Sequence, residues 1–404
     1  MTADAAHNRA ILHCDCNNFY ASVELLKYPE LRDKPVAVAG DPEGRHGIIL
    51  AKNMAAKRLG IKTAETIWQA RRKCPDLILL PPHHDEYEDM SRRINAIYLD
   101  VTDQVEPFSV DESWLDVTGS QRLFGSGRQI ADLLRQRIRD ELGVTISVGV
   151  SDNRWWAKLG SDYKKPDATT CITRDNVAAL LFPLPIRDML FVGESAAQVL
   201  LRHGISTIGQ LADASPAALS QWLGKQGESL HRMANGVDDT PVRRWGESEP
   251  VKSIGNSMTY PHDLVGRDAW HAGLLPLCDS VGARLRAQHL KCRTVTVHVK
   301  DTSLKVISRQ RTLAMPTSLS RQLFQEALAI LEGCWRPDVP IRLLSVTASG
   351  LCSEDEAVPA QLSFLTEVTP DDPRQARIEQ AIDGVHRRFG RAAVKPGTIL
   401  QDDV

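Results

Sequence analysis

The sequence has no apolar run of about 18 residues, the length that a transmembrane helix needs. Residues 1–9 are polar and lead into one short apolar segment, so they do not form a secretory signal. The eight cysteines include no C-x-x-C pair, and Cys14 and Cys16 have no second pair to complete a zinc site. We therefore expect a cytoplasmic protein with reduced thiols and no membrane association.

The chain also lacks a strong net charge, because 49 Lys and Arg against 51 Asp and Glu leave −2. This average is weak evidence against nucleic-acid binding, and it hides a separation along the chain. Residues 252–350 contain 13 basic and 7 acidic side chains, whereas residues 352–404 contain 6 and 10. A basic region beside an acidic tail favours local binding of phosphate groups.

A chain of 404 residues is too long for one ordinary domain, and about two to four are expected. Apolar strands alternate with helical patterns in the first part of the chain, which predicts a mixed sheet backed by helices. The predicted strands lie at residues 11–16, 35–40, 77–80 and 145–150. Residues 51–59 are expected to form a helix, and residues 108–117 a strand, a turn and a strand.

The later part of the chain has a different pattern. Short helices with tight glycine turns are expected at residues 183–222, followed by an exposed linker at 238–250. The alternating run TVTVHV at 294–299 predicts a half-buried strand, with residues 343–348 as its partner. Together with two helical patterns these strands predict a small second α+β domain, and a last helix is expected to reach Phe389.

Carboxylates interrupt two of the predicted strands. Asp15 ends the first strand, and Asp111 and Glu112 lie inside residues 108–117. A buried carboxylate is costly unless it is paired or bound to metal, and hard oxygen ligands suit Mg²⁺. Two such ions about 3.5–4 Å apart can activate a hydroxyl and neutralise a leaving pyrophosphate. A turn-forming Asp and a solvated hairpin corner are the alternatives, and Asp111 and Glu112 can share a site only if the chain bends there.

Six segments resemble motifs of the Y-family DNA polymerases in order and spacing, and among the subfamilies they are most similar to the bacterial DNA polymerase IV group. The segments are DCNNFYASVE (15–24), AKNMAAKRLGIKT (51–63), SVDESWLD (109–116), SVGVSDNRWWAKLGSDYKKP (147–166), KSIGN (252–256) and LKCRTVTVHVKD (290–301). The resemblance covers almost the whole chain.

The resemblance implies an α+β, multidomain right-hand polymerase with palm, fingers and thumb and an additional α+β little-finger domain. The implied parts are the palm (1–18 and 83–173), fingers (19–82), thumb (174–242), linker (243–251), little finger (252–353) and an acidic tail (354–404) with a clamp-binding peptide and a C-terminal helix.

The implied function is DNA-template-directed DNA synthesis past lesions, with transfer of a dNMP to a primer 3′-OH at low fidelity and without proofreading. Asp15, Asp111 and Glu112 match the catalytic carboxylates. Together with the backbone carbonyl of Cys16 they would hold two Mg²⁺ ions, with Mn²⁺ as a second option. The alternatives are a non-catalytic DNA- and clamp-binding scaffold of the same fold and a two-metal nuclease or phosphotransferase.

Matches to the nucleotide-binding residues are less complete. Tyr20 matches the aromatic steric gate that repels a ribose 2′-OH, and Phe19 lies beside it, with core packing as the alternative. Lys165 matches the lysine that contacts the triphosphate. Family contacts in the fingers are commonly Thr, Tyr and Arg, but the aligned residues here are Ala51, Met54 and Lys57, with Lys52 as a further candidate. Which of them hold the triphosphate stays open, since Lys57 lacks the bidentate fork of Arg.

DNA binding is expected in two places. The thumb hairpin of the family has the pattern Gly-hydrophobic-Gly, but the run here is Phe191-Val192-Gly193-Glu194, and Glu194 is expected to weaken the contact with phosphate. The basic little finger should follow the phosphate backbone, with steep salt dependence. Its candidate contacts are Lys252, Lys291, Arg293, Lys300, Arg309 and Arg311.

A short peptide in the acidic tail suggests one more partner. Residues 361–365, which are Gln361, Leu362, Ser363, Phe364 and Leu365, resemble the peptide that docks polymerases on the bacterial sliding clamp (the β subunit). Five residues are a weak match by themselves. The expected partners are therefore primer–template DNA, dNTPs and the sliding clamp, and the chain is expected to be a monomer.

Overall fold

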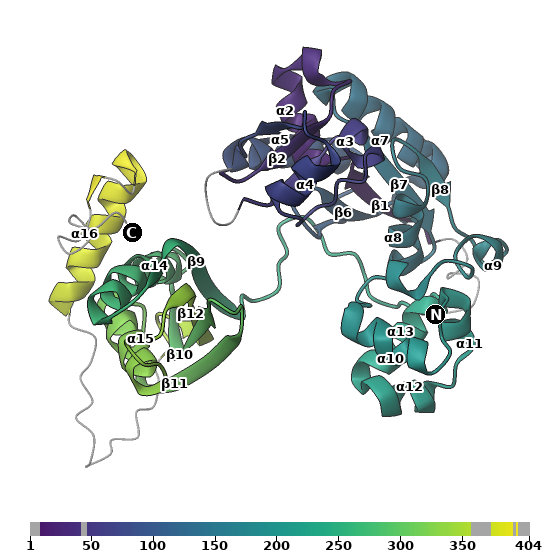
Figure 1. The fold of residues 1–404 in the computed structure, drawn as a ribbon. Helices are drawn as coiled ribbons and strands as arrows, with labels where there is room; N and C mark the ends of the chain where they lie inside the picture. The colour runs from purple at the N-terminus through teal and green to yellow at the C-terminus, as the bar shows by residue number, and fades with distance from the viewer. Residues whose placement is uncertain (1–8, 42–46, 357–372, 391–392, 395–404) are drawn as a thin grey trace. The chain divides into compact units, whose positions relative to one another are not determined.

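The computed structural model describes residues 9–41, 47–356, 373–390 and 393–394. These residues form two compact units, the first ending at Ser248 and the second beginning at Glu249 (Figure 1). Within the described ranges, every helix is too short or too polar to traverse a bilayer. The α+β class predicted from the sequence is confirmed.

The first unit is built on a five-stranded sheet in the order β5–β6–β1–β7–β8. Its strands are β1 (Ile11–Cys16), β5 (Val105–Pro107), β6 (Glu112–Asp116), β7 (Ile146–Ser151) and β8 (Thr169–Cys171). The central strand β1 pairs antiparallel with β6 and β7. Because successive strand residues face opposite sides, Leu12 and Cys14 join the main hydrophobic core, whereas His13 and Asp15 face the other side of the sheet.

Helices cover both faces of this sheet. On the core side lie α2 (Phe19–Lys27), α5 (His84–Leu99) and α7 (Gly127–Leu142), with the short α6 (Gln121–Phe124) before α7. On the other side lies α8 (Arg154–Tyr163), which contacts β1 and β7. Ile130 and Ile138 of α7 are fully buried, and Gly143 ends the helix at a φ of 72°.

Helix α8 approaches β7 unusually closely at Gly149. A Cβ atom on this glycine would lie 1.8 Å from the carbonyl oxygen of Ala157 and 2.5 Å from the amide nitrogen of Ser161. Only glycine permits such an approach of two backbones. Glycine at position 149 therefore allows α8 to pack this closely on the sheet.

A smaller sheet has the order β3–β2–β4. It consists of β2 (Val36–Ala39), β3 (Ile49–Lys52) and β4 (Ile78–Leu80), and it packs with α3 (Met54–Arg58) and α4 (Ile67–Lys73). The helix predicted at residues 51–59 starts too early, because Ala51 and Lys52 belong to β3. Asn53 sets the true start, since its side chain accepts a hydrogen bond from the Ala56 amide at 3.0 Å.

Short helices follow, as the sequence predicts. They are α9 (Val177–Leu180), α10 (Glu194–Arg202), α11 (Ile208–Asp213), α12 (Pro216–Leu223) and α13 (Lys225–Ala234). Their apolar side chains share a core with Trp156 and Leu159 of α8. This group of helices is therefore packed onto the same helix that contacts β1.

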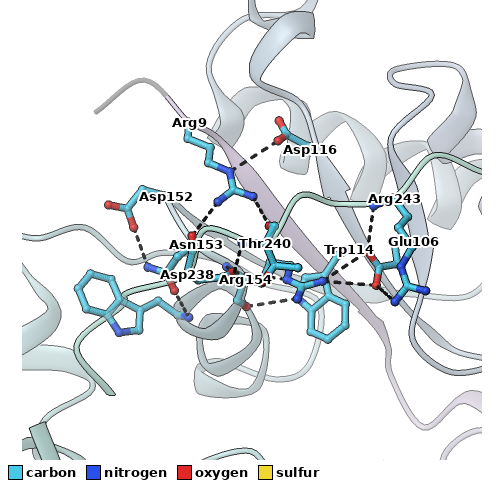
Figure 2. A network of polar contacts seen from close by, with 11 residues as sticks. Arg9, Glu106, Trp114, Asp116, Asp152, Asn153, Arg154, Asp238, Thr240 and Arg243 are labelled. Atoms are coloured by element: carbon cyan, nitrogen blue, oxygen red, sulfur yellow. Dashed lines mark hydrogen bonds and ion pairs between the residues drawn. The ribbon is translucent and has the colours of Figure 1, made fainter. Parts of the chain in front are cut away.

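The prediction of an exposed linker at residues 238–250 is wrong for its first part. The Asp238 side chain is only 2% exposed and forms an ion pair with Arg154 at 3.4 Å. Val242 is buried in a small apolar cluster. Arg243 donates its amide to Glu106 at 2.9 Å and its guanidinium to the same carboxylate at 3.0 Å. Figure 2 shows Arg154 between Asp238 and Glu106. The charged residues predicted a solvated segment, but Asp238 and Arg243 each have a buried partner from elsewhere in the chain.

We call residues 235–245 the strap, because backbone contacts hold them along the first unit. Arg174 donates to the carbonyls of Asn235 and Gly236, and Arg9 donates to those of Asp238 and Thr240. The strap ends where the Trp245 amide donates to the carbonyl of Asp103 at 3.0 Å. It therefore ties the end of α13 to the five-stranded sheet.

The second unit has a four-stranded antiparallel sheet in the order β11–β10–β12–β9. Its elements are β9 (Ser253–Leu264), α14 (Arg267–Ala287), β10 (Leu290–Asp301), β11 (Val306–Thr317), α15 (Ser320–Cys334), β12 (Ile341–Ser353) and α16 (Pro373–Phe389). Figure 1 shows α14 and α15 along one face of this sheet. The pairing predicted for residues 294–299 and 343–348 is confirmed, as is the last helix. That helix docks on α14, where Arg286 binds Glu379 at 2.6 Å and Asp383 at 2.7 Å.

Candidate active site

Asp15 and Glu112 face each other across neighbouring strands, because the register of β1 and β6 pairs them directly. Asp111 lies just before β6, in a bend, and its carbonyl accepts a hydrogen bond from the Cys16 amide at 3.0 Å. Ser109 holds the Asp111 carboxylate at 2.7 Å. The bend that a shared site requires is therefore present, and it brings Asp111 and Glu112 to the end of β1.

Two lysines bind these carboxylates. Lys158 of α8 lies 3.1 Å from Asp15 and 2.6 Å from Glu112, and Lys165 lies 2.7 Å from Asp15. Asp162 binds both ammonium groups, at 3.2 Å and 2.7 Å. Lys165 was predicted from the sequence, but Lys158 and Asp162 were not. Their spacing of four residues on one helix was the only local signal.

The three carboxylates of the cluster have shifted pKa values. Burial raises the pKa of Glu112 to about 7, and the neighbouring Asp15 adds to the effect. Burial also raises the pKa of Asp111. The pKa of Asp15 is lowered, because its hydrogen bond with Glu112 and the charges of Lys165 and Lys158 outweigh the effect of burial. Such opposed shifts within one group of carboxylates are typical of a functional site.

The donor chemistry of this cluster fits a divalent metal ion. Asp15, Asp111 and Glu112 offer carboxylate oxygens, which Mg²⁺ and Mn²⁺ prefer, and the raised pKa values of two of them show a site that favours added positive charge. In the part of the chain that the structure describes, no three acidic, His or Cys side chains are already gathered as a ligand set. The nearest positive charges are instead the ammonium groups of Lys158 and Lys165.

Tyr20 lies in the first turn of α2. Its pKa is raised by burial and by the charge of Asp111. The Tyr20 ring stacks on Tyr87 at 4.0 Å with 13° between the planes. Tyr87 is fixed in turn by its hydroxyl, which donates to the buried carboxylate of Glu24 at 2.6 Å. Phe19 is almost fully buried in the core, so Tyr20 is the more accessible of the two aromatic side chains.

The predicted contacts in the small sheet lie apart from the carboxylate cluster. Lys52, at the end of β3, donates to the Thr63 hydroxyl at 2.9 Å. Lys57 is exposed on α3. The pKa of Lys52 is lowered by burial and by the charge of Lys57, and the charge of Glu65 acts in the opposite direction.

The run Phe191–Glu194 leads into α10. Glu194 is the first residue of that helix, and its exposed side chain forms an ion pair with Arg187 at 2.7 Å. Phe191 takes the left-handed backbone conformation, with a φ of 66°, and its side chain is 52% exposed. An exposed aromatic residue in this conformation is uncommon.

The basic side chains predicted to bind DNA in the second unit lie on both faces of its sheet. Lys300 follows the buried Val299 and so points away from the helices. Arg309 and Arg311 pair with Val297 and Val295 and share their helix-covered face, where Arg311 binds Glu326 of α15 at 3.0 Å. The other candidates are Lys252 and Lys291, together with Arg293, which binds Glu356 at 3.4 Å. The peptide at 361–365 lies outside the described residues.

Two family models match most of the sequence. The description "impB/mucB/samB family" matches residues 14–162, and the C-terminal domain of the same family matches residues 251–364. The first match covers the carboxylate cluster and α8 almost completely. The second covers the sheet and helices of the second unit up to β12 and extends beyond it.

Curated relatives match the chain over nearly its full length. It is 45% identical to a DNA polymerase IV of Acetivibrio thermocellus, covering 98% of both chains. It is 35% identical to a DNA polymerase IV of Clostridium kluyveri, covering 98% of this chain and 99% of the relative. The solved structure of a Y-family DNA polymerase chimera shares the fold with a TM-score of 0.73 at 24% identity, over 84% of this chain and 98% of the chimera.

Proposed function

Because this chain belongs to the Y family of DNA polymerases and is a DNA-directed DNA polymerase for translesion synthesis, we propose that Asp15, Asp111 and Glu112 are its catalytic carboxylates. The main support for this proposal is the direct pairing of Asp15 and Glu112 across β1 and β6. Asp111 is linked to the same strand by the hydrogen bond from the Cys16 amide to its backbone carbonyl. The scaffold alternative is not favoured, since the relatives that match over the full length are polymerases.

Polymerases of this family generally depend on divalent metal ions. Here Asp15, Asp111, Glu112 and the Cys16 carbonyl would hold two Mg²⁺ ions, or Mn²⁺. Bound metal would lower the pKa of the primer 3′-OH and neutralise the pyrophosphate that leaves. The protein supplies fixed oxygen ligands at the end of a rigid central strand, and the three carboxylates offset the charge of the ions.

DNA and dNTPs are the substrates that a DNA polymerase uses. Lys165 would contact the incoming triphosphate, and its ion pair with Asp15 at 2.7 Å supports this role. Lys52 and Lys57 offer further positive charge. Tyr20 would exclude the ribose 2′-OH by its bulk, and its stacking on Tyr87 keeps the ring from swinging away. Phe19 supports this position from the core.

The test is primer extension with all four dNTPs and Mg²⁺. Asp111→Ala should abolish extension while binding of primer–template is retained. Asp140→Ala, which removes an exposed aspartate of α7, serves as the matched control and should extend like the wild type. Extension by Asp111→Ala at the wild-type rate would refute the assignment of the site.

The domain ranges given by the resemblance are part of the same proposal: palm, fingers, thumb and little finger. The boundary between the two compact units, at Ser248 and Glu249, falls inside the proposed linker 243–251. The basic side chains of the little finger would bind the phosphate backbone. The eight cysteines, all in the described part of the chain, form no disulfide bond with one another, and we propose a reducing, cytoplasmic location.

We further propose that the chain works as a monomer tethered to the sliding clamp through Gln361 to Leu365. Tethering raises the local concentration of the enzyme at the primer end. Deleting residues 361–365 should remove the stimulation of synthesis by the clamp and leave clamp-free synthesis unchanged. Equal stimulation of the deleted and intact chains would disprove this docking role.

A further inference from the structure

Lys158 binds three carboxylates at once. Its ammonium group lies 3.1 Å from Asp15, 2.6 Å from Glu112 and 3.2 Å from Asp162. The Lys158 side chain is only 11% exposed, and Asp15 is buried as well. Buried carboxylates that share a site repel each other unless a positive charge lies between them. Lys158 therefore supplies the counter-charge that lets Asp15 and Glu112 lie side by side in the protein alone.

The backbone around Lys158 is fixed against the sheet. Ala157 and Ser161 are the residues of α8 whose backbone atoms a Cβ on Gly149 would overlap. The Ser161 hydroxyl also forms a hydrogen bond of 2.9 Å with Nδ1 of His13 on β1, and it donates one of 2.7 Å to the carbonyl of Lys158. These contacts hold α8 at one distance from β1, so they also set how far the Lys158 side chain reaches.

Lys165 is held less firmly than Lys158. It lies beyond the end of α8, which stops at Tyr163, and its side chain is 24% exposed. It binds Asp15 and Asp162 at 2.7 Å each. If Lys165 turns to an incoming triphosphate, as proposed above, Lys158 is the ammonium group that remains beside the carboxylates.

We propose that Lys158 is a positioning residue for the catalytic carboxylates, which holds Asp15 and Glu112 in place before and after metal ions bind. The inference rests on the proposed metal site, because it concerns how the ligands of that site are kept ready. Groups that are held in place beforehand need no reorganisation when the reaction begins. The same ammonium group repels a cation. Lys158 should therefore weaken metal binding and accelerate the chemical step, two effects that a purely structural residue would not combine.

The first test measures Mn²⁺ binding to the full chain without DNA or nucleotide, from the free-ion signal in electron paramagnetic resonance. Lys158→Met keeps a side chain of similar length without its charge, and Lys158→Arg keeps the charge. Lys164→Met is the matched control, because it removes the charge of an exposed lysine at the end of α8. Lys158→Met should bind Mn²⁺ at least about tenfold more tightly. Lys158→Arg and Lys164→Met should bind it like the wild type.

The second test measures single-turnover incorporation of one nucleotide over a range of Mg²⁺ concentrations. The maximal rate of Lys158→Met should fall at least about tenfold, because Asp15 and Glu112 lose their fixed positions. Its half-saturating Mg²⁺ concentration should fall as well. Lys158→Arg should recover most of the rate. A variant damaged only in its fold would need more metal ion rather than less.

Thermal melting shows whether Lys158 is the counter-charge of the cluster. Without metal ions, Lys158→Met should melt below the wild type, because Asp15 and Glu112 are left uncompensated. Mn²⁺ should raise its melting temperature more than that of the wild type. If the variant does not fold without metal ions, Lys158→Met combined with Glu112→Gln removes one of the repelling charges and should restore a cooperative transition.

Three results would overturn the inference. They are unchanged or weaker Mn²⁺ binding by Lys158→Met, a wild-type maximal rate in this variant, and a double variant that melts no higher than Lys158→Met. The proposed metal site is judged separately, because it fails if Asp111→Ala binds Mn²⁺ as the wild type does, whatever the Lys158 variants do.

Discussion

Replacing Gly149 by alanine should damage both stability and catalysis, because this glycine sets the distance between β7 and α8. The added Cβ would lie 1.8 Å from the Ala157 carbonyl oxygen and 2.5 Å from the Ser161 amide nitrogen. Both atoms belong to the backbone, so no change of rotamer relieves the overlap, and α8 must shift by roughly 1.5 Å to restore normal contact. Overpacking of this severity costs about 3 kcal/mol, of which the lower chain entropy of alanine offsets about 0.5–1 kcal/mol.

The melting temperature of Gly149→Ala should therefore fall by roughly 5–10 °C. Because α8 carries Lys158, which binds Asp15 and Glu112, primer extension should also fall at temperatures where the variant is still folded. The measurements are thermal melting by circular dichroism and single-nucleotide incorporation well below the transition. Gly333→Ala is the matched control, since a Cβ there meets nothing within 4 Å. A melting temperature for Gly149→Ala equal to that of the wild type would refute the reasoning.

Three further predictions follow from the contacts described above. Glu106→Gln should lower the free energy of unfolding by about 3 kcal/mol, because it removes the buried carboxylate charge that binds both Arg154 and Arg243. Glu141→Gln, in an exposed pair, should cost less than about 1 kcal/mol, and equal effects in urea denaturation would contradict this. Tyr20→Ala should raise the ratio of ribonucleotide to deoxyribonucleotide incorporation at least about tenfold. An unchanged ratio in single-turnover kinetics would show that Tyr20 does not select the sugar. Lys300→Ala should reduce the slope of log affinity for DNA against log salt concentration by about 1. Arg311→Ala should leave this slope unchanged, because Arg311 is paired with Glu326 on the helix-covered face. A reduced slope for Arg311→Ala together with an unchanged slope for Lys300→Ala would show that the helix-covered face binds DNA.

The sequence predicted the fold class, most of the strands and four of the clustered charges (Asp15, Asp111, Glu112 and Lys165), because these depend on local pattern or on motif order. It could not predict the contacts that depend on tertiary register. The pairing of Asp15 with Glu112 requires knowing how β1 and β6 align, and Lys158 becomes part of the site only because α8 crosses β1.

The same limit explains the errors. Residues 238–245 look solvated in the sequence, since their charges have no nearby partner there. Their partners, Glu106, Arg154 and Arg9, lie more than 80 residues away and are brought together by the fold. In the helix predicted at 51–59, the cap at Asn53 was a local signal that could have moved its start, but apolar periodicity alone did not show it.

The strap also sets the length of chain that connects the two units. Its last backbone anchor is Trp245, and β9 begins at Ser253, so about seven residues can span the connection, with a maximum reach of roughly 25 Å. An unanchored segment starting at Asp238 would have had about twice that reach. A tether this short keeps the second unit at an effective concentration in the millimolar range beside the first. Loosening the Glu106 contact would therefore lengthen the tether and lower this effective concentration.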